Sequence, residues 1–213
     1  MASGPIVFDE YLEYSKNFEK RHCVDLSEVA LEGARARIGD HGVYHCGSFF
    51  DLEFDDDFFD CALSLHTIYH MDAGRQEIAV RKLLRVTKPG HPVIVVYTSP
   101  RTLLAKLLMP WRWFKQTVKR ILVGRLEPKE PELYFSPHPI DWWRRFEDIA
   151  DVQIFPWRSF DTPHQQVLFP NNALGRWMFD RLFALEDRFP RFFARNFQWP
   201  MIVLRRTGGD SSD

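Results

Sequence analysis

The sequence predicts an α/β fold in which helices cover both faces of a mostly parallel β-sheet. Strand-like and helix-like segments alternate between residues 6 and 97. Two of the strand-like segments, "FFDCALSL" and "PVIVVY", are nearly continuous apolar runs, which is typical of strands covered on both faces. Strands separated by helices at this spacing indicate βαβ units, and therefore parallel strands joined by right-handed crossovers.

The elements of the first half follow from local signals. A helix is expected around Phe8–Phe18 and a short strand at Arg21–Asp25. Ser27 can cap a second helix that stops at Gly39, and Asp72 can cap a third that stops near Lys88-Pro89-Gly90. The segment "GVYHCG" is a further strand between them. The inner faces of the two capped helices are expected to carry Val29, Ala30, Leu31, Ala34 and Ile38, and Ile78, Val80, Leu83, Leu84 and Val86.

The pattern changes after Tyr97. A basic stretch is followed by a proline-rich loop at 126–141, and Asp141 can then cap a helix, "WWRRFEDIA". A strand near "DVQIF", a helix at about Asn172–Phe189 and an antiparallel closing strand, "PMIVLRR", complete the fold, while 207–213 should be disordered. We expect one domain over 1–206, divided into a cofactor-binding half (2–97), an insertion or lid (98–170) and a closing helix and strand (171–206).

Composition excludes several classes of protein. The 213 residues carry a formal net charge of −1, so no global attraction to nucleic acid is expected. No apolar run approaches the ~20 residues that a membrane span requires, and no signal peptide is recognisable. Cys23, Cys46 and Cys61 show no metal-site spacing, which favours free buried thiols in a reducing compartment. The expected location is the cytoplasm.

Candidate ligand-binding residues follow from the topology. In open α/β sheets, ligands bind beyond the carboxyl ends of the strands. This rule selects Ala2–Pro5, Asp25, Gly47–Asp51 and Ser64–His70. Asp25 follows Gly4 by about 20 residues, a spacing at which an acid commonly accepts hydrogen bonds from ribose hydroxyls. The alternative interpretation of Asp25 is a solvated carboxylate at the end of a strand.

Three segments resemble one family in order and spacing. "CVDLSEVALEGA", "CGSFFDLEFDDDFFDCALSLHTIYHMD" and "AVRKLLRVTKPGHPVIVVY" are similar to the middle motifs of class I S-adenosylmethionine-dependent methyltransferases. The resemblance covers about residues 2–97 and implies a Rossmann-like sheet with S-adenosyl-L-methionine as cofactor. "ASGPI" resembles a variant of that family's glycine loop, which follows its first, central strand. The expectation is therefore that the first strand is missing, and that roughly 5–6 mostly apolar residues with an acid near their end precede Met1.

The resemblance also implies roles for individual residues. Ser48 departs from the family pattern, because a hydroxyl replaces the carboxylate beside the adenine amine. The acid that normally precedes the glycine loop is absent. Carried over position by position, Ser3 and Gly4 approach the methionine part of the cofactor, Asp25 binds ribose, Leu26, Ser48 and Phe49 lie by adenine, and Leu65 and His66 border the methionine end and the transfer site.

Methyl transfer is an in-line displacement, and an oxygen or nitrogen acceptor can also need a base. His66, Tyr69 and His70 are the candidate catalytic residues, since histidine titrates near working pH. The structural alternatives are that His66 is a polar wall and that His70 packs under the following helix. His66 and His70 have the i,i+4 spacing of zinc ligands, but no third ligand is evident, so no metal is expected.

The basic stretch at 101–125 has competing interpretations. Its apolar residues recur at three- and four-residue steps with cations between them. It is either a helix packed on the sheet edge with a solvated basic face, or a lid over the acceptor pocket that rests on anionic membrane. Nucleic-acid binding ranks third, because the aromatic residues belong to the apolar stripe.

The functional hypothesis is methyl transfer to a small-molecule or lipid-like acceptor. The alternative comes from another class: a catalytically inactive methyltransferase-like binding or scaffold module, or an N-terminally truncated form of an active enzyme. Asp25 and the segment before His66 favour the enzyme, whereas the missing strand and Ser48 favour loss of activity.

Overall fold

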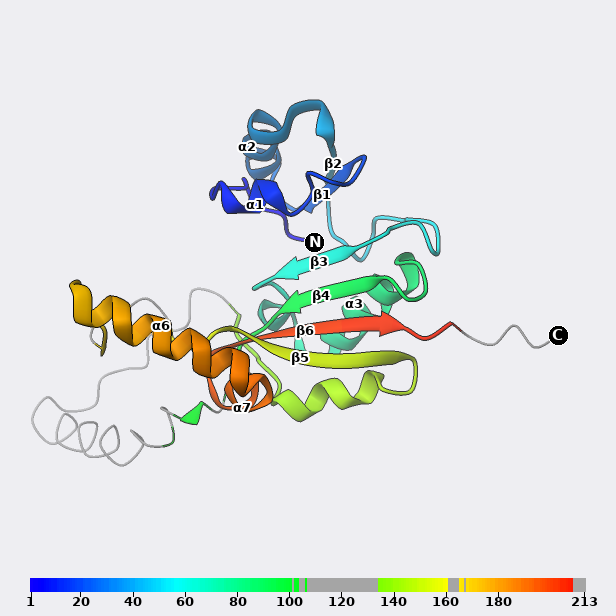
Figure 1. Cartoon of the computed structure of the whole chain (residues 1–213). Helices are drawn as coiled ribbons and strands as arrows, with labels where there is room; N and C mark the ends of the chain where they lie inside the picture. The colour runs from blue at the N-terminus through cyan, green and yellow to red at the C-terminus, as the bar shows by residue number, and fades with distance from the viewer. Residues whose placement is uncertain (101, 104–105, 107–133, 161–164, 167, 209–213) are drawn as a thin grey trace, which may run out of the picture.

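The computed structural model of the chain describes residues 1–100, 102–103, 106, 134–160, 165–166 and 168–208. Within these ranges the strands form two sheets (Figure 1). The first sheet contains β1 (Arg21–Asp25) and β2 (Gly42–Cys46). The second has the strand order β3-β4-β6-β5, with β3 at Ala62–Leu65, β4 at Pro92–Val96, β5 at Ala150–Arg158 and β6 at Trp199–Arg206.

Strand directions confirm the predicted α/β class. β1 pairs with β2 in parallel, and β3 pairs with β4 in parallel. β6 is antiparallel to both β4 and β5, as expected for a closing strand near the C-terminus. β5 therefore joins the sheet through β6, the last strand among the described residues.

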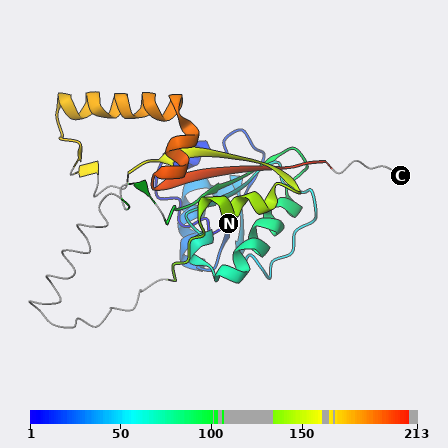
Figure 2. The ribbon, with the colours of Figure 1, turned by 90° about the horizontal axis from the view of Figure 1, so that it is seen from below.

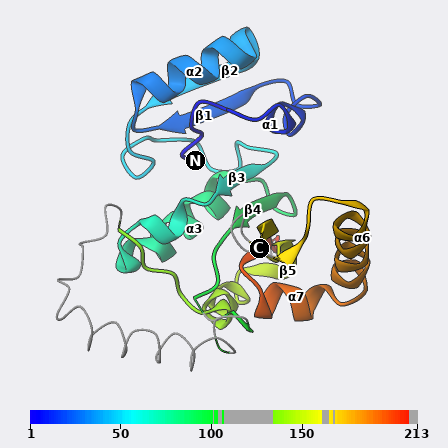
Figure 3. The same ribbon diagram turned by 90° about the vertical axis from the view of Figure 1, so that its left-hand side faces the viewer.

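Helices cover both faces of the larger sheet. Figure 3 shows α3 on one side of that sheet and α6 and α7 on the other, and Figure 2 shows α6 extending beyond the edge of the sheet. The helices are α1 (Glu10–Glu13), α2 (Glu28–Ile38), α3 (Ala73–Val86), α6 (Ala173–Arg188) and α7 (Pro190–Asn196). Three short 3₁₀ helices are described: η1 (Gly39–His41), η2 (Ile68–His70) and η3 (Ile140–Phe146).

Most predicted helix ends are confirmed, because they depend on local hydrogen bonds. Ser27 Oγ accepts from the Ala30 N–H at 3.3 Å, and Gly39, at φ +50°, ends α2. Asp72 Oδ1 accepts from the Gly74 N–H at 2.9 Å at the start of α3. Asn172 Oδ1 does the same for Gly175 at the start of α6, at 3.1 Å.

Other sequence expectations were wrong. The helix predicted at Phe8–Phe18 is only the four-residue α1, which has no side-chain cap and buries none of its residues. Asp141 caps no helix, because η3 begins after Pro139 with no side-chain cap. The strand predicted over "FFDCALSL" is confined to β3. Before it, Phe59 forms an isolated parallel bridge with Thr87, and Phe58 and Phe59 pack edge-on against each other and against His22.

Burial also corrects some expectations. Val29 is 76% exposed and Ile78 is 56% exposed, so neither belongs to the inner face of its helix. The buried residues of α2 are Leu31 and Ala34. Cys23, Cys46 and Cys61 are free, as predicted, but Cys46 is exposed and Cys61 is half-buried.

The chain has two cores of unequal size. The larger core lies between the β3-β4-β6-β5 sheet and the elements packed on it, and its largest fully buried members include Trp143, Tyr97 and Phe146. The smaller core joins β1 and α2 and consists of Ile6, Cys23, Leu31 and Ala34. The β1–β2 sheet therefore has a small core of its own, although Val24 of β1 belongs to the larger core.

Some predictions fall largely or wholly outside the described ranges. Of the basic stretch at 101–125, only Thr102, Leu103 and Lys106 are described, and residues 209–213 of the predicted disordered tail are not. In the part of the chain that the structure does describe, no helix is long and apolar enough to cross a membrane.

Candidate active site

The N-terminal turn is held against the end of β1 by hydrogen bonds that its backbone N–H groups donate. The Ser3 N–H donates to the Val24 carbonyl at 3.0 Å, and the Gly4 N–H donates to Asp25 Oδ2 at 2.9 Å. Gly4 has φ +60°, a conformation that glycine adopts without strain, and a Cβ built on it would meet nothing within 4 Å. The turn therefore leaves open space beside the Gly4 backbone, which a ligand can approach.

Asp25 organises this end of the site. Its Oδ1 accepts from the Ser27 N–H at 3.0 Å, so the same carboxylate connects the N-terminal turn to the start of α2. A carboxylate has about four lone-pair positions, and these two bonds leave acceptor capacity for hydroxyl donors. The neighbouring Leu26 is 77% exposed and offers an apolar surface next to the acid. A carboxylate acceptor next to an apolar side chain is chemically suited to a nucleoside, since the first can accept from ribose hydroxyls and the second can cover a base.

A cavity of about 600 Å³ lies next to the turn. Of the predicted site residues, Ser3, Phe49, Leu65 and His66 line this cavity. The lining does not include Gly4, Asp25, Leu26, Ser48, Tyr69 and His70. The predicted residues are thus divided among the end of β1, the loop after β2, the 3₁₀ helix η2 and the cavity.

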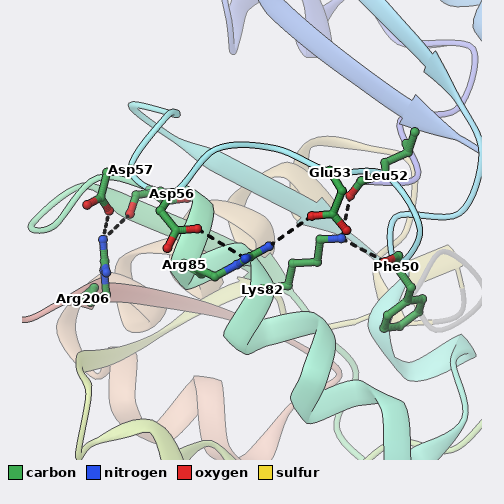
Figure 4. Close-up of polar contacts among 9 residues, drawn as sticks. Phe50, Leu52, Glu53, Asp56, Asp57, Lys82, Arg85 and Arg206 are labelled. Atoms are coloured by element: carbon green, nitrogen blue, oxygen red, sulfur yellow. Dashed lines mark hydrogen bonds and ion pairs between the residues drawn. The ribbon is translucent and has the colours of Figure 1, made fainter.

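The loop after β2 is fixed from α3, an arrangement that the sequence did not reveal. Lys82 Nζ donates to the Phe50 carbonyl at 3.0 Å and to the Leu52 carbonyl at 2.6 Å (Figure 4). Arg85 forms ion pairs with Glu53 and Asp56 of the same loop. The partners of Lys82 are backbone carbonyls, which any residue supplies, so no sequence signal could have identified this contact.

Ser48 and Phe49, which are predicted to lie by adenine, make different contacts. Ser48 Oγ accepts from the Phe50 N–H at 3.2 Å, so its hydroxyl stabilises the loop and keeps a hydrogen that it can donate. The Phe49 ring belongs to the larger core, with Lys82 Nζ 5.3 Å from its centroid.

His66 follows β3 in a strained conformation. Its φ is +53°, which is uncommon for a residue with a side chain, and residues in such conformations are enriched at functional sites. Its N–H donates to the Val96 carbonyl at 3.0 Å, and its ring meets Trp199 edge-on with 4.5 Å between centroids. Burial, with smaller contributions from Arg158 and His70, lowers the pKa of His66. The imidazole is therefore neutral at neutral pH.

Tyr69 supports His66. Its Oη lies 3.2 Å from His66 Nδ1, and burial, helped by Tyr97, raises the pKa of Tyr69 to about 12. The phenol thus stays protonated and is not a base at neutral pH. Its ring packs edge-on against Tyr97, whose hydroxyl donates to Gln76 Oε1 at 2.8 Å.

His70 faces a different segment. Its Nδ1 lies 2.9 Å from the Tyr134 carbonyl, which requires a proton on Nδ1. A second hydrogen bond joins the same two segments: the Ser136 N–H donates to the Tyr69 carbonyl at 2.9 Å. His70 therefore anchors the chain where it returns to the sheet. Among the described residues, no group of three or more metal-ligating side chains surrounds it.

Two residues near His66 were missed by the sequence analysis. Trp199 contacts the His66 ring, and Arg158, its partner in the β5–β6 register, contributes to the lowered pKa of His66. Both lie far from His66 in the sequence and come from strands whose pairing order was not predicted.

Comparisons with known proteins bear on the fold that carries this site. Residues 2–95 match the family model described as a methyltransferase domain. A search among curated proteins finds no match. The fold is similar to that of a SAM-dependent methyltransferase from Archaeoglobus fulgidus, with a TM-score of 0.53 and 13% identity, covering 96% of this chain and 83% of that one.

Two further structures have the same fold. Geranyl diphosphate C-methyltransferase from Streptomyces coelicolor A3(2), in complex with S-adenosyl-L-homocysteine, gives a TM-score of 0.55 at 16% identity over 97% of this chain and 69% of that one. The cyclase SpnF gives 0.56 at 17% identity over 98% and 74%. The second example shows that the fold also hosts other reactions. Residues 2–95 are thus similar to a methyltransferase domain, and the fold of the chain is like that of S-adenosylmethionine-dependent methyltransferases.

Proposed function

We propose that this chain transfers a methyl group from S-adenosylmethionine to a small-molecule or lipid-like acceptor. The observation that carries the proposal is the Asp25 carboxylate, which binds the Gly4 N–H beside open space at the end of β1. An acid in this place holds a nucleoside through its ribose hydroxyls. The match of residues 2–95 to a methyltransferase domain supports this choice of ligand.

The residues divide the work of binding. Asp25 holds the ribose, Leu26 covers one face of the adenine, and the hydroxyl of Ser48 donates toward the base from the opposite loop. Ser3, Gly4 and Leu65 surround the methionine end. The bound cofactor supplies an electrophilic methyl group on a sulfonium. The protein mainly contributes alignment, which can lower a barrier by roughly 7–11 kcal/mol.

His66 handles the acceptor's proton in this proposal. With its Nδ1–H donated to the Tyr69 oxygen, its Nε2 keeps a lone pair that takes the proton from an acceptor hydroxyl or amine. The lowered pKa of His66 keeps this nitrogen unprotonated at neutral pH. Tyr69 and His70 act as positioning residues, the first on the His66 ring and the second on the segment at Tyr134.

The binding step is tested by calorimetric titration of S-adenosylhomocysteine into Asp25→Ala. Loss of hydrogen bonds to a charged acceptor costs about 1.5–3 kcal/mol, so affinity should fall about 10- to 100-fold. Glu32→Ala, on the exposed side of α2, is the matched control and should bind like the parent. Because Asp25 also holds the N-terminal turn, the melting temperature of each variant is measured alongside. Equal affinity in Asp25→Ala and the parent would refute the proposal.

The acceptor class is tested with methyl-labelled S-adenosylmethionine. The protein is incubated separately with aqueous metabolite extract, lipid extract, protein and nucleic acid. Label should appear in the metabolite or lipid fraction and be lost in His66→Gln. Label found only in protein or nucleic acid would contradict the proposed acceptor class.

A further inference from the structure

The helix α6 is almost uncovered. Of its 16 residues only Gly175 is buried, at a point where a Cβ would meet the Pro170 carbonyl oxygen at 1.7 Å. Isolated helices of this length are marginal in water, and most helices are stabilised by packing an apolar face. Figure 2 shows that α6 extends beyond the edge of the sheet. Its apolar side chains are therefore available to a partner outside the described part of the chain.

The inner side of α6 has partners within the chain. Phe179 stacks on Phe169 with 4.2 Å between ring centroids, and Phe183, which is 54% exposed, stacks on Phe179 at 5.9 Å. The Glu186 carboxylate accepts a hydrogen bond from the Ser159 hydroxyl. These contacts fix which side of the helix faces the protein.

Apolar and basic side chains share the outer side of α6. Leu174, Trp177 and Leu185 are 56%, 54% and 46% exposed. Residues three or four positions apart lie on one face of a helix, so these three residues share a face with Arg181 and Arg188. We call this set of five residues the α6 stripe.

The stripe is positively charged. The Arg181 guanidinium lies 5.7 Å from the centroid of the Trp177 ring, and that of Arg188 lies 5.6 Å from the centroid of the Phe189 ring. Within the described ranges, no carboxylate forms an ion pair with either arginine. Both cations are therefore available to an anionic partner, and both lie beside exposed aromatic rings.

The acids of α6 lie off the stripe. Asp180 and Asp187 directly precede Arg181 and Arg188, which is a step of about 100° around a helix. Glu186 is turned toward Ser159, and burial raises its pKa. The stripe thus presents cations and apolar groups with no carboxylate among them.

This combination suits an anionic lipid surface. Helices that lie in the membrane interface carry Trp, Phe and Leu on one face together with Lys or Arg, and they bind by apolar burial and by attraction to anionic lipids. Tryptophan is enriched at the level of the headgroups. Arginine can bury its stem along apolar surface while its guanidinium stays among polar groups.

Two other covers match the stripe less well. A second copy would bury too little area: α6 is roughly 24 Å long, so a stripe about 10 Å wide buries roughly 240 Å² per copy, against about 800 Å² in stable interfaces. A two-fold axis through the stripe would also place Arg181 against its own counterpart. The basic stretch at 101–125 contains seven Lys or Arg and no acid, so its charge has the same sign as that of the stripe.

We propose that the α6 stripe docks on the surface of a membrane that contains anionic lipids. Leu174, Trp177 and Leu185 would enter the boundary between headgroups and acyl chains, and Arg181 and Arg188 would contact lipid phosphates. The helix would lie along the bilayer surface, because the stripe occupies one side of it. This inference concerns where the protein binds and does not depend on the proposed methyl transfer.

Cosedimentation with vesicles of phosphatidylcholine and phosphatidylserine tests the proposal. One double variant, Arg181→Glu with Arg188→Glu, removes the cations of the stripe, and another, Trp177→Ser with Leu185→Ser, removes apolar groups. Each should bind the vesicles at least about tenfold more weakly than the parent. Melting temperatures of the variants establish that they are folded.

The matched control changes the net charge equally at other exposed positions. Lys16 and Arg144 have side chains that are 61% and 67% exposed. Because exposed charges are screened beyond about 8 Å at physiological ionic strength, Lys16→Glu with Arg144→Glu should bind within about twofold of the parent. Vesicles of phosphatidylcholine alone should bind the parent weakly.

Several results would overturn the proposal. If both stripe variants sedimented like the parent, the stripe would not contact lipid, and any binding would belong to another segment, since residues 101–125 are unchanged in them. An equal loss in the control variant would mean that net charge alone drives binding. A dimeric parent that Trp177→Ser with Leu185→Ser converts to a monomer would assign the stripe to a second copy.

Discussion

The β1–β2 unit and the β3-β4-β6-β5 sheet differ in how well they are supported. The larger sheet packs against a continuous core that contains Trp143 and Phe146, whereas the smaller unit has a core of four fully buried residues. An isolated pair of strands is marginally stable at best. Asp25 and Leu26, which would hold the adenosine, lie on the weaker unit, and Leu65 and His66, at the methyl end, lie on the stronger one. A bound cofactor would therefore hold the two units together.

Truncating a core residue in each unit should reveal the difference in support most clearly. Trp143→Ala should cost about 3–5 kcal/mol and lower the stability of the whole chain, because it opens the larger core. Leu31→Ala should cost about 2–5 kcal/mol and accelerate hydrogen exchange mainly in β1, β2 and α2. Exchange measured by mass spectrometry separates the two patterns. Identical exchange across both units in Leu31→Ala would mean that they unfold as one.

The junction between the units should make stability depend on pH. The Met1 amino group has a pKa of about 6 when folded and 8.0 when exposed, so between these values the unfolded chain binds more protons. The free energy of unfolding is therefore highest above pH 8. It falls by about 2–3 kcal/mol as the pH falls toward 6. Arg21, Cys23 and Asp25 surround this group.

Urea unfolding at pH 6 and pH 8 measures the effect on protein whose mass confirms that Met1 is retained. An Nα-acetylated form is the control, since it cannot titrate at this position. Burial also lowers the pKa of His22 and His45, but these groups are common to both proteins and cancel in the difference. If the free energy of unfolding changed equally with pH with and without the acetyl group, the lowered pKa of the Met1 amino group would be contradicted.

Substitution of His66, at the end of β3, should have a smaller effect on stability, and it tests the backbone conformation there. Because its φ is +53°, replacement by glycine should be more stable than replacement by alanine, by about 1 kcal/mol. Both variants lack the imidazole and should lose methyl transfer equally. Thermal unfolding of the pair measures the difference. An alanine variant as stable as the glycine variant would mean that the left-handed backbone is not retained.

The smallest expected effect is membrane binding by the segment between β4 and η3. If the basic stretch at 101–125 contacts membrane, the protein should sediment with anionic vesicles and be released as salt rises, because exposed charges are screened within about 8 Å at physiological ionic strength. Neutral vesicles are the control. No binding to anionic vesicles at low salt would leave the segment as a packed helix with a solvated face.

Local signals explain why much of the fold could be predicted. Ser27, Asp72 and Asn172 cap helices through hydrogen bonds to residues two or three positions ahead, so a short stretch of sequence contains the whole interaction. The exposure of Val29 and Ile78 could not be predicted in this way. Which side of a helix is buried depends on the sheet beneath it, and that sheet is assembled from distant segments.

In the candidate site, too, some residues could be predicted from local sequence and others could not. Asp25 and Gly4 were recognisable because a strand end and a glycine turn have a characteristic spacing. Lys82 and Trp199 were not, because one binds backbone carbonyls and the other reaches His66 from the last strand. Residues that position others through tertiary contacts have no short-range pattern to reveal them.

The place of β6 in the larger sheet has a consequence for the order of events during synthesis. β5 is connected to that sheet through β6, and Pro92 of β4 pairs with Arg205 near the end of the chain. A ribosome-bound chain that lacks its last residues therefore has an open edge on β4 and no partner for β5. Because pairing between residues so far apart in sequence forms slowly, the larger sheet should close only after β6 has emerged from the ribosome.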